Sequence, residues 1–237
     1  LRYFLPHILI LSTSSPFWHG RNTGLKSYRS IIFENLPRTG IPPTFKSYYD
    51  YQAFVQTLGK AGSIGKRGDG KADYTKLLWD CRPQEDFGTL EIRVSDVCTT
   101  IDEAVCIAAL VQALCAKLVK LRSQNQSWRI YRTELIAENK WRAVRFGLDG
   151  KLVDYGKAEA VPARFIAKEL IAFVDDVRDD LGSRQEVEYI HTILERGSSA
   201  DRQLDVYRDA IAHGADDTHA LHAVVDHLRK ETMLGTT

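Results

Sequence analysis

The sequence of 237 residues predicts an α+β fold, in which a pair of strands stands between helical segments. Residues 77–82 and 89–96 alternate apolar and polar side chains, which is the period of a half-buried strand. A long apolar segment with helical start signals follows over 100–122, and helix-forming segments dominate from residue 162 onward. This order favours α+β over alternating βαβ units.

Composition excludes several classes of protein. Hydrophobic residues make up 44% and charged residues 27%, which is too apolar for intrinsic disorder and too charged for a membrane bundle. The net charge of +1 gives no electrostatic reason to expect nucleic acid or a membrane as a partner. The four cysteines form no Cys-x-x-Cys pair, so we expect no zinc site, no disulfide framework and a reducing, cytoplasmic setting.

The segments before the strands alternate between helices and loops. The sequence predicts a buried helix over 2–13, a glycine and aromatic loop over 16–24, a short helix over 25–35, a helix capped by Ser47 that ends near residue 58, and a surface loop over 59–76. Three prolines separate the last two helices, because proline restricts the residue before it to extended conformations.

The strand pair is predicted as an antiparallel hairpin with two unlike faces. The apolar face holds Leu77, Trp79, Cys81, Leu90, Ile92 and Val94, and the polar face holds Asp80, Arg82, Glu91 and Arg93. In solvent, Glu91 and Arg93 would form only a weak ion pair. In a cleft, a carboxylate for Mg²⁺ beside a guanidinium for phosphate would suit phosphoryl transfer. The residues alone leave both interpretations open.

The strongest helix signal follows the strand pair. Thr100 and Glu103 form a capping box, and residues 104–114 are almost wholly apolar. We therefore expect a central helix buried on most sides under the sheet. Thr133 is expected to cap a further helix, which Gly147 ends.

The rest of the chain is predicted to be mainly helical. After a short strand over 152–155, helices are expected within 162–182, 183–197, 200–213 and 217–234. We expect one domain over 1–237, of which 162–237 form a helical C-terminal region.

Arginines and histidines supply further candidates. Arg21, Arg29 and Arg38 stand among glycines; solvated arginine is the ordinary interpretation, but a bidentate guanidinium also suits carboxylate or phosphate recognition. His219 and His222 share a helix face and could ligate a metal with a third group, although solvated histidines are favoured.

Several motifs occur in a fixed order along nearly the whole chain. They are Ser14-Ser15-Pro16-Phe17-Trp18-x-Gly20-x-x-Thr23-Gly24-x-x-Ser27-Tyr28-Arg29, Arg38-Thr39-Gly40, Trp79-Asp80-x-Arg82-Pro83, Thr89-Leu90-Glu91-x-Arg93-Val94-x-Asp96, Glu138-Asn139-x-Trp141-Arg142-Ala143-x-Arg145-x-Gly147-Leu148-Asp149-Gly150 and Ala200-Asp201-Arg202-Gln203. Together they resemble the glutamate–cysteine ligase type 2 family of ATP-dependent carboxylate–amine ligases.

The resemblance implies a fold and a set of roles. The fold is glutamine-synthetase-like, with a curved antiparallel sheet, backed by helices, that carries ATP, Mg²⁺ and substrate. Glu91 would be a Mg²⁺ ligand, Arg93 would contact the γ-phosphoryl group, and Arg29 would grip the substrate carboxylate. The other implied roles are catalysis for Arg82 with Arg93, substrate binding for Arg38 and Trp18, and ATP binding for Asn139, Arg142 and Arg202 with Arg93.

The implied activity joins a carboxylate, the γ-carboxylate of glutamate, to an amine such as that of cysteine through an acyl phosphate. We expect small-molecule amino-acid substrates, no nucleic acid and no membrane, and leave a homo-oligomer open. One alternative is a non-catalytic remnant that serves as a ligand-binding or regulatory subunit; another is a metallohydrolase that uses the C-terminal histidines. Members of the family begin with a strand of the Glu-x-Glu type that supplies further metal ligands, and residues 1–237 do not include it. We therefore expect this chain to be the latter two-thirds of a larger catalytic domain. An upstream extension, carboxylates from another chain and an inactive chain are the alternatives.

Overall fold

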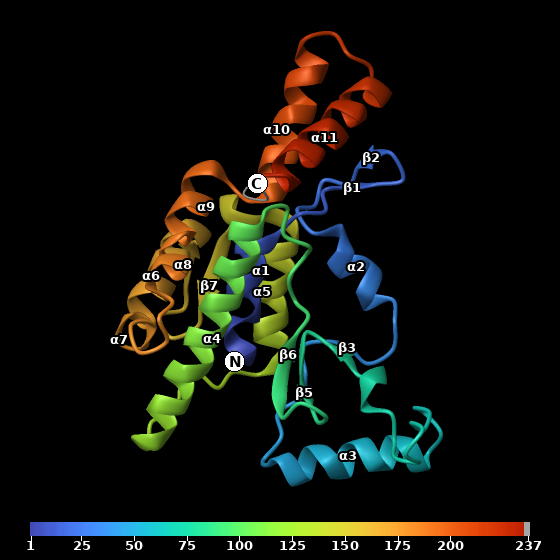
Figure 1. The fold of residues 1–237 in the computed structure, drawn as a ribbon, viewed down its shortest axis with the longest axis vertical. Coiled ribbons are helices and arrows are strands. Elements are labelled where there is room, and N and C mark those ends of the chain that lie inside the picture. Colours follow the sequence, from blue (N-terminus) through green and yellow to red (C-terminus); the bar gives the residue numbers. More distant parts are fainter. Residues whose placement is uncertain (235–237) are drawn as a thin grey trace. The chain divides into compact units, whose positions relative to one another are not determined.

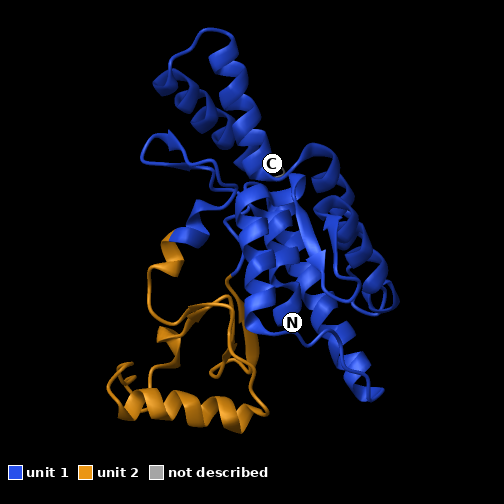
Figure 2. Cartoon of the chain, turned by 180° about the vertical axis from the view of Figure 1, so that it is seen from behind, with its two compact units in different colours: residues 1–31, 94–237 blue, residues 32–93 orange. Residues whose placement is uncertain are grey.

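The chain forms two compact units in the computed structural model, which describes residues 1–234 (Figure 1). Unit 1 holds residues 1–31 together with the chain from Val94 onward, and unit 2 holds residues 32–93 (Figure 2). The boundary between the two units falls within helix α2 (Tyr28–Glu34), after Ile31.

Unit 1 is mainly helical and is built around one buried helix. After a 3-10 turn (Arg2–Phe4), α1 (Leu5–Ser12) has all eight side chains buried, which confirms the helix predicted over 2–13. The helices that contact it are α4 (Ile101–Ser123), α5 (Thr133–Phe146), α6 (Ala163–Phe173) and α9 (Ile190–Arg196). The remaining helices are α7 (Asp175–Arg178), α8 (Arg184–Glu188), α10 (Ser199–Ala212) and α11 (Asp217–Thr232). Helix α1 therefore forms the centre of the core of this unit (Figure 1).

Helix α4 begins as predicted but is buried on one face only. The Thr100 hydroxyl accepts from the Glu103 amide at 3.2 Å, and the Glu103 carboxylate accepts from the Thr100 amide at 3.2 Å. The opposite face is exposed, with Val119 at 69% exposure. The expectation of burial on most sides was wrong. Apolar composition shows that a helix face could be buried, but whether other elements cover that face depends on tertiary packing.

Helix α4 is also long and apolar enough to cross a membrane, by length and composition alone. No other helix within residues 1–234 passes that test. A core helix of a globular protein passes it too, and α4 packs against α1, α7 and α8. The observation is weak evidence for a membrane span.

Two details around α5 differ from the prediction. Thr133 is the first helical residue and not the cap, and its hydroxyl accepts from Arg2 at 2.6 Å. Gly147 ends the helix at φ 54°, as predicted. The strand expected over 152–155 is β7 (Lys151–Asp154), and it pairs antiparallel with β8 (Glu159–Pro162), which was missed. The sequence of β8 is short and ends in proline, so it has too few residues for a clear period of two.

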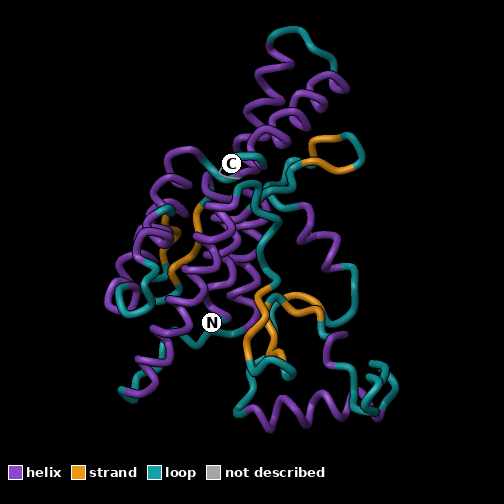
Figure 3. The backbone as a smooth tube through the Cα atoms, viewed as in Figure 1, coloured by secondary structure: helices purple, strands orange, loops and turns teal. Residues whose placement is uncertain are grey.

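Helices dominate the chain beyond residue 162, where the sequence predicted them. Helices α10 and α11 pack against each other as an antiparallel hairpin that extends beyond the other helices of unit 1 (Figure 3). Near the start of the chain, β1 (Phe17–Trp18) and β2 (Arg21–Asn22) form a two-residue ladder within the predicted loop.

Unit 2 has its own small core beneath a capped helix. Helix α3 (Tyr48–Lys60) starts at Ser47, whose hydroxyl accepts from the Asp50 amide at 3.1 Å, as predicted. Its buried face meets the chain around the 3-10 turn Tyr74–Lys76. The core residues are Tyr51, Val55, Ile64, Ala72, Tyr74, Leu77 and Trp79.

Two small sheets complete unit 2. Strands β3 (Thr39–Gly40) and β4 (Leu78–Trp79) pair in parallel, and β5 (Cys81–Gln84) pairs antiparallel with β6 (Thr89–Ile92). The predicted antiparallel pairing is confirmed for Arg82 with Glu91, but the segment predicted over 77–82 is divided between β4 and β5, with Asp80 between them. Leu90 on the expected apolar face is 41% exposed. The fold class α+β is thus confirmed. Each sheet within residues 1–234 has two strands, so the wide curved sheet stays a prediction.

Candidate functional site

A carboxylate between two guanidinium groups forms the centre of the candidate site. The register of β5 and β6 sets Arg82 opposite Glu91, so both side chains leave the same face of the hairpin. Arg82 Nη2 lies 2.7 Å from Glu91 Oε2, and Arg93 Nη1 lies 2.7 Å from Glu91 Oε1. The polar face predicted from alternation therefore brings these three residues together in unit 2.

Arg82 is committed to the fold of unit 2. It is buried, its Nε donates to Glu91 at 2.9 Å, and its Nη1 donates to the carbonyls of Leu77 at 2.6 Å and Thr75 at 2.5 Å. Each guanidinium nitrogen thus has a protein acceptor. The geometry fits Arg82 to hold Glu91 in position, and the catalytic role that the resemblance implies stays a prediction.

Arg93 is the guanidinium that can meet a ligand. Its side chain is 26% exposed and its guanidinium lies over the Phe33 ring, 5.7 Å from the ring centre. Its Nε is buried and bonds to no described residue. A buried donor without an acceptor is costly, so an anionic ligand at this point would satisfy it. Arg93 therefore fits a phosphate oxygen.

Glu91 is the only acid of this cluster, and it is held as a carboxylate. Partial burial acts to raise its pKa, but the hydrogen bonds from Arg93 and Arg82 outweigh burial and hold the pKa below its usual value. Magnesium in nucleotide sites is commonly held by one or two carboxylates together with phosphate oxygens and waters. Glu91 fits the role of one such ligand among several, and residues 1–234 contain no cluster of three His, Cys, Asp or Glu side chains.

The predicted substrate-binding residues Trp18 and Arg29 lie in unit 1. Trp18 is 44% exposed and stacks on Tyr28, with 5.4 Å between the ring centres. The Arg29 amide donates to the Ser15 hydroxyl at 3.0 Å. Asp96, which closes the motif that contains Glu91, accepts from that same hydroxyl at 2.7 Å. No role for Asp96 was predicted from the sequence, although its place in the motif was the available signal.

Arg38 lies in unit 2, just before β3. Its backbone is left-handed at φ 61°, and its Nε donates to the Lys76 carbonyl at 3.2 Å. This contact ties the side chain to the turn that precedes β4. Its role toward substrate stays a prediction.

The three residues expected to bind ATP in unit 1 make structural contacts. The side-chain amide of the buried Asn139 donates to the Val153 carbonyl at 2.9 Å, and its oxygen accepts from the Val153 amide at 2.7 Å. These two hydrogen bonds join β7 to α5. Arg142 pairs with Glu138 one helical turn away, at 2.7 Å. These contacts give Asn139 a packing role and place Arg142 on a helix surface.

Arg202 is the most deeply paired of the three. It is buried, and it donates to Glu103 at 2.7 Å, to Glu231 at 2.9 Å and to the Gly197 carbonyl at 2.8 Å. The group links α4, α10 and α11. A nucleotide would have to displace one of these acceptors, so the structure favours a structural role for Arg202.

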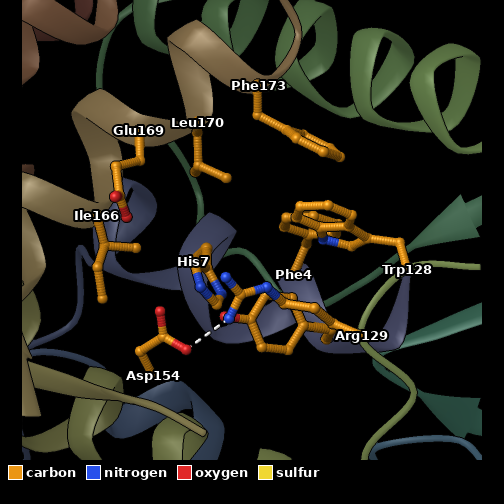
Figure 4. A pocket seen from close by; sticks show the side chains of 10 residues that line it. Phe4, His7, Trp128, Arg129, Asp154, Ile166, Glu169, Leu170 and Phe173 are labelled. Atoms are coloured by element: carbon orange, nitrogen blue, oxygen red, sulfur yellow. Dashed lines mark hydrogen bonds and ion pairs between the residues drawn. The ribbon is translucent and has the colours of Figure 1, made fainter. Parts of the chain in front are cut away.

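A separate cavity of about 180 Å³ lies in unit 1 (Figure 4). Aromatic rings of Phe4, Trp128 and Phe173 form one side of it, and an ion pair between Arg129 and Asp154 at 2.6 Å forms another. None of the site residues predicted from the sequence lines this cavity. The cavity is therefore distinct from the candidate site.

The C-terminal histidines give no support to a metal centre. The rings of His219 and His222 are 6.3 Å apart, and His219 Nδ1 pairs with Asp216 at 2.8 Å. Across the described residues no third metal-binding side chain joins them. The metallohydrolase interpretation therefore lacks a site within residues 1–234.

The chain thus has an α+β fold and, at the β5–β6 hairpin, an ionised carboxylate beside an arginine with a buried donor that has no acceptor among the described residues. These features fit a protein that binds anionic ligands. Comparison with known proteins identifies the group more closely. The chain belongs to glutamate–cysteine ligase family 2, whose family model matches residues 1–227.

Individual relatives support this assignment. A protein of Roseiflexus castenholzii with the name "Putative glutamate--cysteine ligase 2" is 55% identical over 234 residues, which cover 99% of this chain and 58% of that protein. Proteins with the same name from Herpetosiphon aurantiacus and Sorangium cellulosum are 53% and 50% identical, again over 99% of this chain and 57% and 59% of their own lengths. The chain thus spans somewhat more than half the length of these relatives.

Proposed function

We propose that this chain is part of a ligase that uses ATP and Mg²⁺ to join a carboxylate, the γ-carboxylate of glutamate, to an amine such as that of cysteine. The observation that supports it is the ion pair between Glu91 on β6 and Arg93 just after that strand, in a chain whose relatives carry the name "Putative glutamate--cysteine ligase 2". The arginine has an unused buried donor and the acid is held ionised, as an anion-handling site needs.

The chemistry follows from the weakness of a carboxylate as an electrophile. A carboxylate oxygen attacks the γ-phosphorus of ATP, ADP leaves, and the acyl phosphate then loses phosphate when the amine nitrogen attacks its carbon. The proton of the amine passes to solvent. Such a reaction depends mainly on the alignment of anions and the neutralisation of their charge.

The residues of unit 2 have separate tasks in this proposal. Arg93 would bind an oxygen of the transferred phosphoryl group, and Glu91 would be one ligand of Mg²⁺, which supplies charge neutralisation when bound. Arg82 would hold the Glu91 carboxylate in place, since each of its guanidinium nitrogens already has an acceptor within the unit.

The test measures phosphate release from ATP by the complete protein, with glutamate and a panel of amines. Release should require both the acid and the amine. Arg93→Ala should lower the rate at least about 100-fold, because it removes donors aimed at developing negative charge. Arg67→Ala is a matched control, since Arg67 is equally exposed and pairs with Asp86 in the same unit; its rate should stay within about twofold of wild type.

Two outcomes would count against the proposal. Full turnover in Arg93→Ala would remove the site assignment. A complete protein that releases no phosphate with any amine, yet is stabilised against heat by ATP or glutamate, would favour the ligand-binding or regulatory subunit instead.

A further inference from the structure

Asp96 is a buried carboxylate that gathers donors from two distant segments of unit 1. It is 5% exposed. Its Oδ2 accepts from the Ser14 amide at 2.8 Å and the Ser15 hydroxyl at 2.7 Å, and its Oδ1 accepts from the Ser27 hydroxyl at 2.7 Å. The two segments precede Asp96 by about 70 to 80 residues.

Two of these serines, Ser15 and Ser27, also form hydrogen bonds with the start of α2, where Arg29 lies. Ser15 Oγ, which donates to Asp96, accepts from the Arg29 amide at 3.0 Å. The Ser15 carbonyl accepts from the Tyr28 amide at 2.8 Å. Ser27 Oγ also pairs with Ser30 Oγ, at 2.9 Å, in the first turn of α2. A continuous set of hydrogen bonds thus runs from the Asp96 carboxylate through Ser15 to the backbone of Arg29.

The cost of this arrangement indicates a purpose beyond packing. Burial raises the pKa of Asp96, and the hydrogen bonds from Ser14, Ser15 and Ser27 and the charge of Arg29 act in the opposite direction. Apolar residues of similar volume often stabilise a core as well as buried ionic groups do. What a buried carboxylate adds is a fixed geometry for its donors.

We propose that Asp96 is a positioning residue for the acid substrate: through Ser15 and Ser27 it fixes the start of α2, and with it the Arg29 side chain that binds the substrate carboxylate. This inference rests on the proposed ligase function and on the substrate role of Arg29. It assigns recognition of the acid, and not phosphoryl transfer, to the Asp96 network.

Steady-state kinetics of the complete protein test the role. Asp96→Ala should raise KM for glutamate about tenfold, because a displaced binding group weakens a charged contact. kcat and the KM for ATP should stay within about twofold, because the Glu91–Arg93 pair is untouched. Asp154→Ala is the matched control: Asp154 is 7% exposed, also lies in unit 1, and pairs with Arg129 away from Arg29.

Two further variants separate positioning from stability. Asp96→Asn can still accept from the Ser14 amide and the Ser15 hydroxyl while its amide donates to Ser27, so it should restore most of the glutamate affinity. Ser15→Ala removes the link with Asp96 intact and should reproduce the KM change even if Asp96→Ala fails to fold. In an Arg29→Ala background, Asp96→Ala should cause no further loss of kcat/KM for glutamate.

The contrary results are equally specific. An unchanged KM for glutamate in foldable Asp96→Ala and Ser15→Ala would overturn the proposal, and so would equal losses with and without Arg29. Amide hydrogen exchange tests the proposal without an activity assay. The Arg29 amide should exchange faster in Asp96→Ala than in Asp154→Ala, and equal protection in the two variants would also overturn the proposal. Absence of phosphate release by the wild-type protein would refute the proposed ligase function. The exchange experiment would still show whether Asp96 positions the Arg29 backbone.

Discussion

At the residue scale, the candidate site separates into groups that support and groups that can bind. Arg82 and Arg93 flank the same carboxylate, yet Arg82 is buried and donates to that carboxylate and to backbone carbonyls, whereas Arg93 keeps an unused donor. A pair of arginines that look equivalent in sequence therefore has unequal tasks. The difference comes from burial, which fixes how many donors remain for a ligand.

His7 provides a prediction about pH. It is buried, which lowers its pKa to about 4, so the folded chain keeps it neutral where the unfolded chain binds a proton. The free energy of unfolding should therefore fall as the pH drops from about 6.5 to 4, by up to about 3 kcal/mol from this group.

Urea unfolding across that range, in wild type and His7→Gln, measures this contribution. The variant should lose less stability than wild type on acidification, because glutamine has no proton to gain. Parallel pH profiles for the two proteins would contradict the assignment of this slope to His7.

At the element scale, capping decides where several helices begin. Ser198 begins α10: its hydroxyl accepts from the Asp201 amide, and it also accepts from Thr13 at 2.8 Å, so the cap joins α10 to the end of α1. The residue is fully buried, which leaves water no access to replace a lost partner. The cap thus serves local structure and packing together.

Ser198→Ala should destabilise unit 1 by about 1–2 kcal/mol, because it removes a cap and leaves the Thr13 hydroxyl unpaired. Chemical denaturation followed by circular dichroism measures the change. Ser123→Ala, at the exposed end of α4, should stay within about 0.5 kcal/mol of wild type. Equal effects in both variants would show that the buried cap adds nothing special.

At the scale of the whole molecule, unit 1 is joined by buried charges between segments far apart in sequence. Arg202 on α10 bonds Glu103 at the start of α4 and Glu231 near the end of α11. All three side chains are buried, and Arg202 compensates both carboxylates, of which Glu231 also pairs with Arg196 at 2.5 Å.

Arg202→Met should therefore cost about 3–5 kcal/mol, because it leaves two buried carboxylates without their main partner. Thermal and urea unfolding measure the loss. Adding Glu103→Gln and Glu231→Gln to the same chain should recover part of it, because the uncompensated charges are gone. A loss below about 1 kcal/mol would contradict the structural role and leave the ATP-binding prediction as the better account of Arg202.

Much of the local structure could be predicted from the sequence. The caps at Ser47 and Thr100, the end of α5 at Gly147 and the polar face of the β5–β6 hairpin all depend on neighbours within a few residues. Such interactions follow from residue type and spacing, which a sequence states directly. The order of the motifs likewise predicted the family to which the chain belongs.

Only the tertiary structure decided which of the polar residues are bonded within the fold and which keep a donor without an acceptor among the described residues. Arg202, Asn139 and Asp96 each bond partners many residues away, and nothing in their local sequence indicates burial. The exposed face of α4 and the pairing of β8 with β7 depend on long-range packing in the same way. The sequence by itself determined the elements and the motif residues, because those forces act locally; burial, which assigns each charged group a binding or a structural task, arises only when distant segments meet.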